Sequence, residues 1–255
     1  MTDTVERFSN RVENYVKYRP DYPQAIVPFL MENCGLTRES IIADIGCGPG
    51  ISSRMFLENG NRVFGVEPNA AMREEAGRFL VKFPWFIPVD GTSDHTTLSD
   101  GSVDMVVAAQ AFHWFDPNTT RPEFHRILKP GGHIVLIWNE RQLDTTPFLI
   151  EYEAFLVKYA YDYGSVRHEN IQAKELSDFF QKEYGSATFE NFQDFDFEGL
   201  KGRMLSASYM PNETDAIFEE MIKELRALFA KHAENDRIKV FYDTKVYFSP
   251  VRAGA

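Results

Sequence analysis

Residues 44–50 read Asp-Ile-Gly-Cys-Gly-Pro-Gly and come directly after an apolar run that begins at Ile41. Glycine has no Cβ and adopts positive φ readily, so this turn can bend sharply and let a ligand touch its backbone. An acidic residue, Glu67, ends the next apolar run, and a carboxylate there can accept hydrogen bonds from both hydroxyls of a ribose. These residues predict a site for a cofactor that contains a nucleoside.

Two common nucleotide sites do not match the glycine turn. A dinucleotide fingerprint that starts at Gly46 needs glycine at position 51, where this chain has Ile51. A phosphate-binding P-loop needs Gly-Lys followed by Ser or Thr, and the chain has no lysine between Ile41 and Val81. NAD and nucleoside triphosphates are therefore disfavoured as ligands.

Apolar runs alternate with helical patterns along the chain, which predicts strand-helix-strand units and a mainly parallel sheet. Helical spacing follows the first two strands, at residues 52–59 and from Met72 to Leu80. A further helix carries apolar residues from Ile217 to Leu228 at helical spacing. The expected strands are Ile41–Ile45, Arg62–Val66, Trp85–Val89, Val103–Ala109, His133–Trp138, Phe192–Phe197 and Ile238–Phe248.

No repeat or long linker divides the 255 residues, so a single domain is expected. Its core takes residues 35–140 and 190–250, and an N-terminal lid takes about residues 1–25. Aromatic-rich helical stretches at Phe148–Tyr163 and Glu175–Tyr184 predict a cap insertion over the sheet edge, at about residues 145–188.

Four further motifs follow the glycine turn in order: Glu67, Asp90-Gly91-Thr92, Ser99–Asp104 and Leu128–Gly132. Three other segments extend the pattern toward both ends of the chain: Ala109–Asp116, the N-terminal Tyr15–Pro23 and the C-terminal Gly202–Tyr209. In this series the chain resembles the class I S-adenosylmethionine-dependent methyltransferases, and within them the type 11 small-molecule branch that includes trans-aconitate methyltransferase-like proteins. The resemblance implies an α/β fold: a Rossmann-like, seven-stranded, mostly parallel sheet with helices on both faces and the last strand antiparallel.

The resemblance gives roles to the residues of the cofactor site. The backbone of Gly46 and Gly48 approaches the methionine part of S-adenosylmethionine, and Glu67 holds the ribose. Asp44 binds the cofactor's ammonium group or ties the loop together, two readings that the sequence leaves open. Gln110 faces the region of methyl transfer.

Adenine recognition is assigned to residues just beyond the second and third strands. Asn69 and Met72 line the adenine pocket, where the Met thioether packs on the ring. Gly91, Thr92 and Ser93 form the next segment. Many members of the class have Asp where this chain has Thr92, so the Ser93 backbone is expected to carry more of the adenine recognition.

Two other elements complete the expected site. Tyr18 and Arg19 resemble a lid, and Arg19 can clamp a carboxylate of the cofactor or of the substrate. His113 is the candidate catalytic base, with a packing role for the His113-Trp114 pair held equally open. Cys47 is expected to be a small filler of the turn.

Methyl transfer asks mainly for alignment, because the sulfonium is already a good leaving group. A carboxylate acceptor is ionised at neutral pH and needs only positioning, whereas a hydroxyl, amine or carbon acid needs a base such as His113. A rival reading is a non-catalytic S-adenosylmethionine-binding sensor or scaffold, prompted by Thr92 and the lack of an obvious base. A nicotinamide-dependent oxidoreductase ranks third.

Composition limits the partners. The net charge of -11 and the absence of a basic cluster argue against nucleic acid, and leave a small-molecule methyl acceptor as the expected partner. With two cysteines, no secretory signal and no apolar stretch of about 20 residues, the prediction is a cytoplasmic protein that does not enter a membrane. No metal is expected, because the histidines show no ligand spacing. Monomer and homodimer both stay open.

Overall fold

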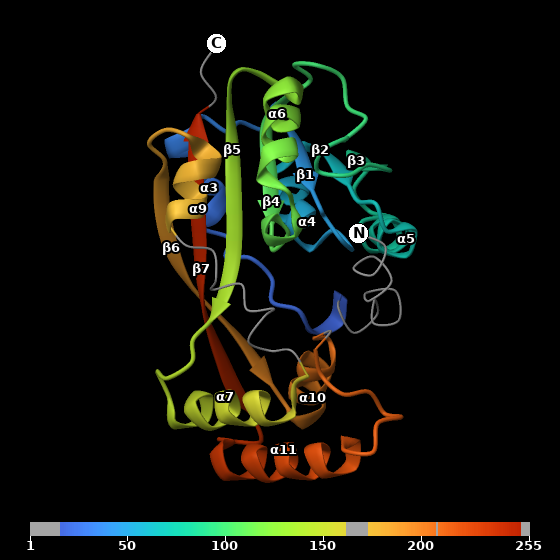
Figure 1. The fold of residues 1–255 in the computed structure, drawn as a ribbon, viewed down its shortest axis with the longest axis vertical. Helices are drawn as coiled ribbons and strands as arrows, with labels where there is room; N and C mark the ends of the chain where they lie inside the picture. The colour runs from blue at the N-terminus through green and yellow to red at the C-terminus, as the bar shows by residue number, and fades with distance from the viewer. Residues whose placement is uncertain (1–15, 162–172, 208, 251–255) are drawn as a thin grey trace.

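The computed structural model describes residues 16–161, 173–207 and 209–250, which form a seven-stranded sheet with helices around it (Figure 1). The expected lid residues up to Tyr15, the Tyr163 end of the first expected cap helix, and Ser208 lie outside the described residues. The strands are β1 Ile41–Ile45, β2 Arg62–Val66, β3 Phe86–Val89, β4 Val103–Ala109, β5 Leu128–Arg141, β6 Gly185–Phe195 and β7 Ile238–Pro250.

The sheet has the strand order β3-β2-β1-β4-β5-β7-β6. Strands β1 to β5 are parallel, and β7 pairs antiparallel with both β5 and β6. The expected Rossmann-like sheet with an antiparallel last strand is therefore confirmed. The order reverses between β1 and β4, and a crevice forms outside the carboxyl ends of strands at such a point.

Each face of the sheet is covered by helices because the central strands are apolar on both sides. Along β4, Met105 and Val107 pack in one cluster with α3 (Ile26–Cys34) and α4 (Ile51–Asn59). The alternate residues Val106 and Ala108 pack in the other cluster with α6 (Pro117–Ile127) and α9 (Ala173–Phe180). Helix α5 (Ala70–Phe79) connects β2 to β3. This sandwich fixes the strand ends that carry the candidate site.

Strands β6 and β7 extend past the end of β5 and reach three helices at the far end of the sheet (Figure 1). These are α7 (Pro147–Tyr159), α10 (Phe197–Leu205) and α11 (Phe218–His232), called here the distal helices. They share an apolar cluster of their own with the ends of β6 and β7. Of the expected cap segment, only α7 belongs to the distal helices, and α10 and α11 come from the C-terminal part of the chain. Helix α9, also of the expected cap segment, packs on the sheet beside α6.

The boundaries of β5 and β6 differ most from the sequence prediction, and β5 extends beyond the expected His133–Trp138 at both ends. Strand β6 begins at Gly185, not at Phe192, because its residues alternate between half-buried and exposed positions on an edge strand and show no continuous apolar run. The predicted strand end at Phe197 is wrong. Asp196 instead caps α10, its side chain accepting a 2.7 Å hydrogen bond from the Gly199 backbone nitrogen.

None of the described helices is both long and apolar enough to cross a membrane.

Candidate functional site

The glycine turn lies at the reversal of strand order, directly after β1. Gly46, Gly48 and Gly50 have φ of 69°, 54° and 88°, in the left-handed region that favours glycine. A Cβ on Gly46 would lie 2.7 Å from the Ala111 Cβ, whereas a Cβ on Gly48 would meet nothing within 4 Å. The turn is therefore packed from behind at Gly46 and open in front at Gly48.

Glu67 connects the turn to the next helix. One carboxylate oxygen accepts from the Gly48 nitrogen at 3.0 Å and the other from the Asn69 nitrogen at 2.9 Å. The side chain is nearly buried, and burial raises its pKa above the ordinary value although both backbone N–H groups lower it. Each oxygen has a further lone pair, so Glu67 can hold the loop and still accept from a ligand hydroxyl.

Asp44 is fully buried beneath the turn. Its Oδ2 accepts from the hydroxyls of Ser52 and Ser53 at 2.6 and 2.7 Å, which ties β1 to the start of α4. Its Oδ1 has no hydrogen-bond partner among the described residues. Burial raises the pKa of Asp44 to about 6, against the two serine hydroxyls that lower it. The structure thus shows the loop-tying contacts, and the ammonium-binding role stays a prediction.

Asp44→Asn should change how stability depends on pH. The carboxyl binds its proton more tightly in the folded state, so this group stabilises the fold below pH 4 and loses that contribution as pH rises to about 6. The loss is on the order of 3 kcal/mol for a shift of about two pKa units. Urea unfolding measures this change. Between pH 4 and pH 7 the free energy of unfolding of wild type should fall by about that amount relative to the free energy of unfolding of Asp44→Asn. A difference that is constant across this range would contradict the raised pKa of the buried Asp44.

A cavity of about 50 Å³ opens in front of the turn. Its lining includes Gly46–Pro49 of the glycine turn, Ile51 and Ser52 at the start of α4, Gln110 after β4, and Asn139 near the end of β5. Arg19 and Arg203 line it from the N-terminal segment and from α10. Groups from opposite ends of the chain therefore meet over the glycine turn, in what is called here the glycine-loop cavity.

The N-terminal segment is held over this cavity by polar contacts. Its backbone carbonyl groups at Tyr18 and Asp21 accept from the side chains of Gln193 and Asn191 at 3.0 and 2.8 Å. Arg19 donates to the Ser206 carbonyl at 3.1 Å. Figure 1 shows this segment, in blue, passing between the sheet and α10. Tyr18 and Arg19 thus lie where a lid is expected, although their binding roles stay predictions.

Gly202 on α10 leaves the space that Tyr18 fills. A Cβ at this position would lie 2.2 Å from Tyr18 Cε2. Gly202→Ala should therefore push Tyr18 away and lower the free energy of unfolding by about 1–3 kcal/mol, the usual cost of overpacking. Gly77→Ala is the matched control, because a Cβ on that helical glycine meets nothing within 4 Å, and it should stabilise by about 0.4–1 kcal/mol. Equal unfolding free energies for both variants would contradict the Tyr18 packing.

The residues assigned to adenine lie on the same edge of the sheet. Asn69 caps α5, its side chain accepting from the Met72 nitrogen at 3.1 Å, and both residues are buried. Thr92 donates to Asp94 at 2.6 Å, so its hydroxyl keeps only acceptor capacity for a ligand. Ser93 accepts from Thr120 at 2.9 Å.

Gly91, which precedes them, is buried, and a Cβ there would lie 2.8 Å from the Thr96 carbonyl oxygen. The segment is thus tightly folded, and its contact with adenine stays a prediction.

Gln110 and His113 follow β4 but lie in different surroundings. Gln110 has φ of 55°, donates to the Asn139 carbonyl at 3.0 Å and keeps Oε1 without a partner among the described residues. Gln110 thus brings an unused acceptor to the wall of the glycine-loop cavity. His113 lies in the short helix η1 (Phe112–Trp114) with its ring 4.8 Å from that of Trp114, and it is not among the residues that line the cavity. Its catalytic role stays untested.

Cys47 is buried in the turn, and burial raises its pKa well above the ordinary value. A thiol that stays protonated is a poor nucleophile, which agrees with the expected role of Cys47 as a small filler of the turn.

Asn139 and Arg203 are polar residues of the cavity lining that sequence reasoning missed. Asn139 follows the predicted strand His133–Trp138 by one position, and the longer β5 carries it into the site. Arg203 belongs to the matched segment Gly202–Tyr209, which was the only signal for it. Both positions depend on how β5 and α10 pack, so spacing along the chain does not reveal them.

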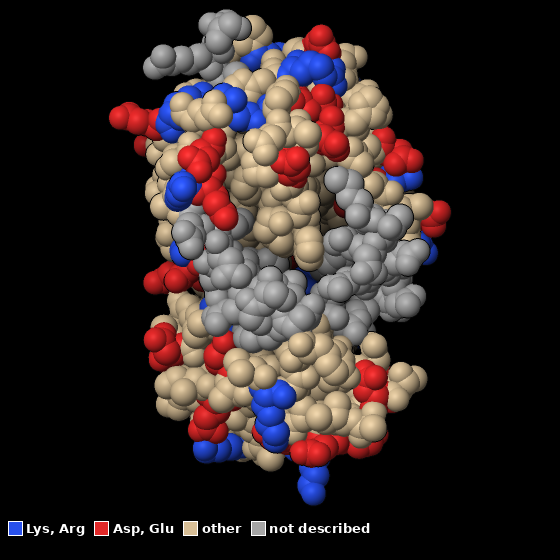
Figure 2. Space-filling view, in the orientation of Figure 1, with Lys and Arg blue, Asp and Glu red and all other residues tan. Residues whose placement is uncertain are grey.

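The charges on one face of the molecule are mixed in sign (Figure 2). On the face drawn in Figure 2, Lys and Arg are interspersed with Asp and Glu, and no broad basic patch is seen over its described residues. The part of the chain that the structure describes also contains no group of three or more His, Cys, Asp or Glu that could hold a metal ion.

Comparison with known proteins agrees with this geometry. A family model described as a methyltransferase domain matches residues 43–136, from β1 to β5. The chain is 27% identical over 252 residues to an uncharacterized methyltransferase-like protein of Schizosaccharomyces pombe, covering 96% of this chain and 95% of that protein. It is 31% identical over 170 residues to a probable S-adenosylmethionine-dependent methyltransferase of Saccharomyces cerevisiae, covering 65% of this chain and 55% of the yeast protein.

A solved structure from Anaeromyxobacter dehalogenans, which bears the name of a type II methyltransferase, shares the fold. The TM-score is 0.69 at 20% identity, over 93% of this chain and 100% of that one. The trans-aconitate-like detail of the resemblance stays a prediction.

Proposed function

The chain is a class I S-adenosylmethionine-dependent methyltransferase, and we propose that it methylates a small-molecule acceptor that carries a carboxylate. The observation that carries the proposal is the glycine-loop cavity, which two arginines, Arg19 and Arg203, line together with the turn at Gly46–Pro49. The cavity lies between the sheet end, the N-terminal segment and α10, so a compact anion fits it better than a polymer. The acidic net charge of -11 also disfavours a nucleic-acid acceptor.

The residues present fit S-adenosylmethionine. The open space over Gly48 lets a ligand approach the backbone. Gln110 Oε1 and Asp44 Oδ1, which have no hydrogen-bond partner among the described residues, are acceptors near the turn. Gly46 and Gly48 would hold the methionine part, Glu67 the ribose, and Asn69, Met72 and the Gly91–Ser93 segment the adenine. When bound, the cofactor supplies an electrophilic methyl group on a sulfonium whose leaving group is a neutral thioether.

The protein's own part is positioning. Arg19 and Arg203 would orient the acceptor, and the N-terminal segment would exclude water, so that nucleophile, methyl carbon and sulfur lie in line. A carboxylate acceptor is already ionised at pH 7 and needs no base, which agrees with the place of His113 outside the cavity lining.

Methyl transfer can be measured with methyl-labelled S-adenosylmethionine and a panel of small carboxylates, amines and phenols. The proposal expects methyl esters, recognised by their lability in alkali. It also expects a rate that is flat between pH 6.5 and pH 8.5 and unchanged in His113→Ala. Methylation of amines or phenols alone would overturn the carboxylate acceptor. Binding of the cofactor without turnover of any panel member would favour the sensor reading.

A further inference from the structure

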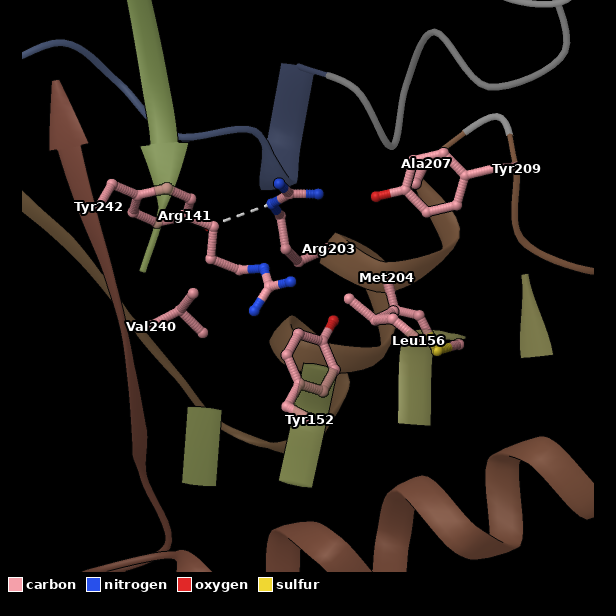
Figure 3. A pocket seen from close by; sticks show the side chains of 9 residues that line it. All are labelled: Arg141, Tyr152, Leu156, Arg203, Met204, Ala207, Tyr209, Val240 and Tyr242. Carbon is pink, nitrogen blue, oxygen red and sulfur yellow. Dashed lines mark hydrogen bonds between the residues drawn. The ribbon is translucent and has the colours of Figure 1, made fainter. Parts of the chain in front are cut away.

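A second cavity lies between the sheet end and the distal helices, and its lining is rich in arginine and tyrosine. Arg141 enters it from the end of β5, Tyr152 from α7, Arg203 from α10 and Tyr242 from β7, and Tyr209 follows α10. In Figure 3 both guanidinium groups and the hydroxyls of Tyr152 and Tyr209 turn toward one space. This space is called here the distal cavity.

The two arginines differ in how their charge is balanced. Arg141 forms an ion pair with Glu153 and stacks over the Tyr152 ring, 5.4 Å from its centroid. Arg203 has no carboxylate partner among the described residues, and its one hydrogen bond there runs from Nε to the Tyr242 hydroxyl at 3.2 Å. The two terminal nitrogens of Arg203 make none of the hydrogen bonds described. A half-buried guanidinium without a counter-charge favours binding of an anion.

The tyrosines around Arg203 are suited to the same ligand. Tyr152 is 3% exposed, and burial raises its pKa above the ordinary value, so its hydroxyl stays protonated and can donate. The Tyr242 hydroxyl donates to Gln193 at 2.9 Å and accepts from Arg203, which fixes the guanidinium plane. A planar fork of N–H groups beside hydroxyl donors matches a carboxylate.

Arg203 is also the residue that lines both the distal cavity and the glycine-loop cavity. An anion held by Arg203 therefore lies next to the space where the methyl donor is expected. The distal cavity is small, about 10 Å³, which is room for roughly one water. A planar carboxylate is therefore favoured there over a bulkier tetrahedral phosphate. The rest of a ligand held there has to extend toward the glycine-loop cavity.

We infer that Arg203, supported by Tyr152, Tyr209 and Tyr242, is the anchor for a carboxylate of the methyl acceptor. This inference rests on the proposed function and adds the residue that selects the acceptor. The other two arginines have different places: Arg19 lines the N-terminal side of the glycine-loop cavity, and Arg141 is paired with Glu153. The anchored carboxylate lies on the distal side of the glycine-loop cavity, where it positions the reacting group of the same molecule toward the glycine turn.

Binding of simple anions to the protein saturated with S-adenosylhomocysteine tests this anchor. Acetate, succinate, glutarate and benzoate, and separately inorganic phosphate, are titrated by calorimetry against wild type, Arg203→Gln and Arg203→Lys. At least one of the carboxylates should bind wild type more tightly than phosphate does. Arg203→Gln should weaken that binding by about 10- to 100-fold, as expected for the loss of a charged hydrogen-bond donor, and Lys should restore only part of it.

Arg226→Gln is the matched control, because Arg226 stacks on Phe197 from the exposed side of α11 and lines neither cavity. It should leave carboxylate binding unchanged. The dissociation constant of S-adenosylhomocysteine should be the same in every variant.

Weaker S-adenosylhomocysteine binding in Arg203→Gln, with carboxylate binding intact, would assign Arg203 to the cofactor and overturn the inference while the proposed function stands. Tighter binding of phosphate, or no carboxylate binding to wild type, would also overturn the inference. Failure of wild type to bind S-adenosylhomocysteine would instead contradict the proposed function.

Discussion

Glu67→Ala should weaken binding of S-adenosylmethionine and S-adenosylhomocysteine by about 1.5–3 kcal/mol, or roughly 10- to 150-fold in dissociation constant. Two losses add in this variant. The ribose loses its acceptor, and the backbone nitrogens of Gly48 and Asn69 lose the carboxylate that holds them at 3.0 and 2.9 Å. Isothermal titration with S-adenosylhomocysteine measures the change.

Glu67→Gln separates the two contributions. The amide keeps one oxygen as acceptor and places an NH₂ group where the other accepted, so an intermediate loss of affinity is expected. Glu74→Ala serves as control, since Glu74 is an exposed acid on the neighbouring helix α5, and it should bind like wild type. Glu67→Ala with wild-type affinity would remove Glu67 from the cofactor site.

Gly48→Ala and Gly46→Ala should separate stability from affinity. At Gly48 the added Cβ meets no protein atom within 4 Å, so the fold loses only about 1–2 kcal/mol for left-handed strain. That Cβ enters the space expected for the cofactor, and affinity for S-adenosylhomocysteine should fall at least about tenfold, or about 1.4 kcal/mol. At Gly46 the added Cβ would lie 2.7 Å from the Ala111 Cβ, and this overpacking adds about 1–3 kcal/mol to the strain. Gly46→Ala should therefore lower the free energy of unfolding more than Gly48→Ala does.

Gly101→Ala is the control for backbone strain. Gly101 has the same φ as Gly48, 54°, and equally open surroundings, but it lies in the turn before β4 at the opposite end of the strand. Urea unfolding should give similar losses for Gly101→Ala and Gly48→Ala, and calorimetry should show weaker cofactor binding only for Gly48→Ala. Equal cofactor affinity in the two variants would mean that no ligand approaches Gly48.

The core of the fold was predictable because its signals are local. The first four strands match the expected ranges to within one residue, since each is a short apolar run that ends in a turn. The places of Gly46, Gly48, Glu67 and Gln110 also followed, because each comes directly after a predicted strand. In a parallel sheet the carboxyl ends of the strands share one edge, so these residues had to meet.

The distal part of the molecule was harder to predict. Strand β6 alternates on a sheet edge and lacks an apolar run, and its first seven residues fall between the expected helix that ends at Tyr184 and the expected strand that begins at Phe192. Arg141 and Arg203 are brought together by β5 and α10, so no spacing in the sequence relates them. Arg203 has no carboxylate partner among the described residues. The sequence around Arg203 does not reveal this, because it depends on which side chains pack there in three dimensions.

Titration of S-adenosylhomocysteine into the wild-type protein, beside Gly48→Ala and NADH, tests the central claim most directly. The structure predicts one S-adenosylhomocysteine bound per chain, at least about tenfold weaker binding in Gly48→Ala, and no heat with NADH. Neither heat nor a thermal shift with S-adenosylhomocysteine, or saturable binding of NADH in its place, would contradict a methyl-donor site at the glycine turn.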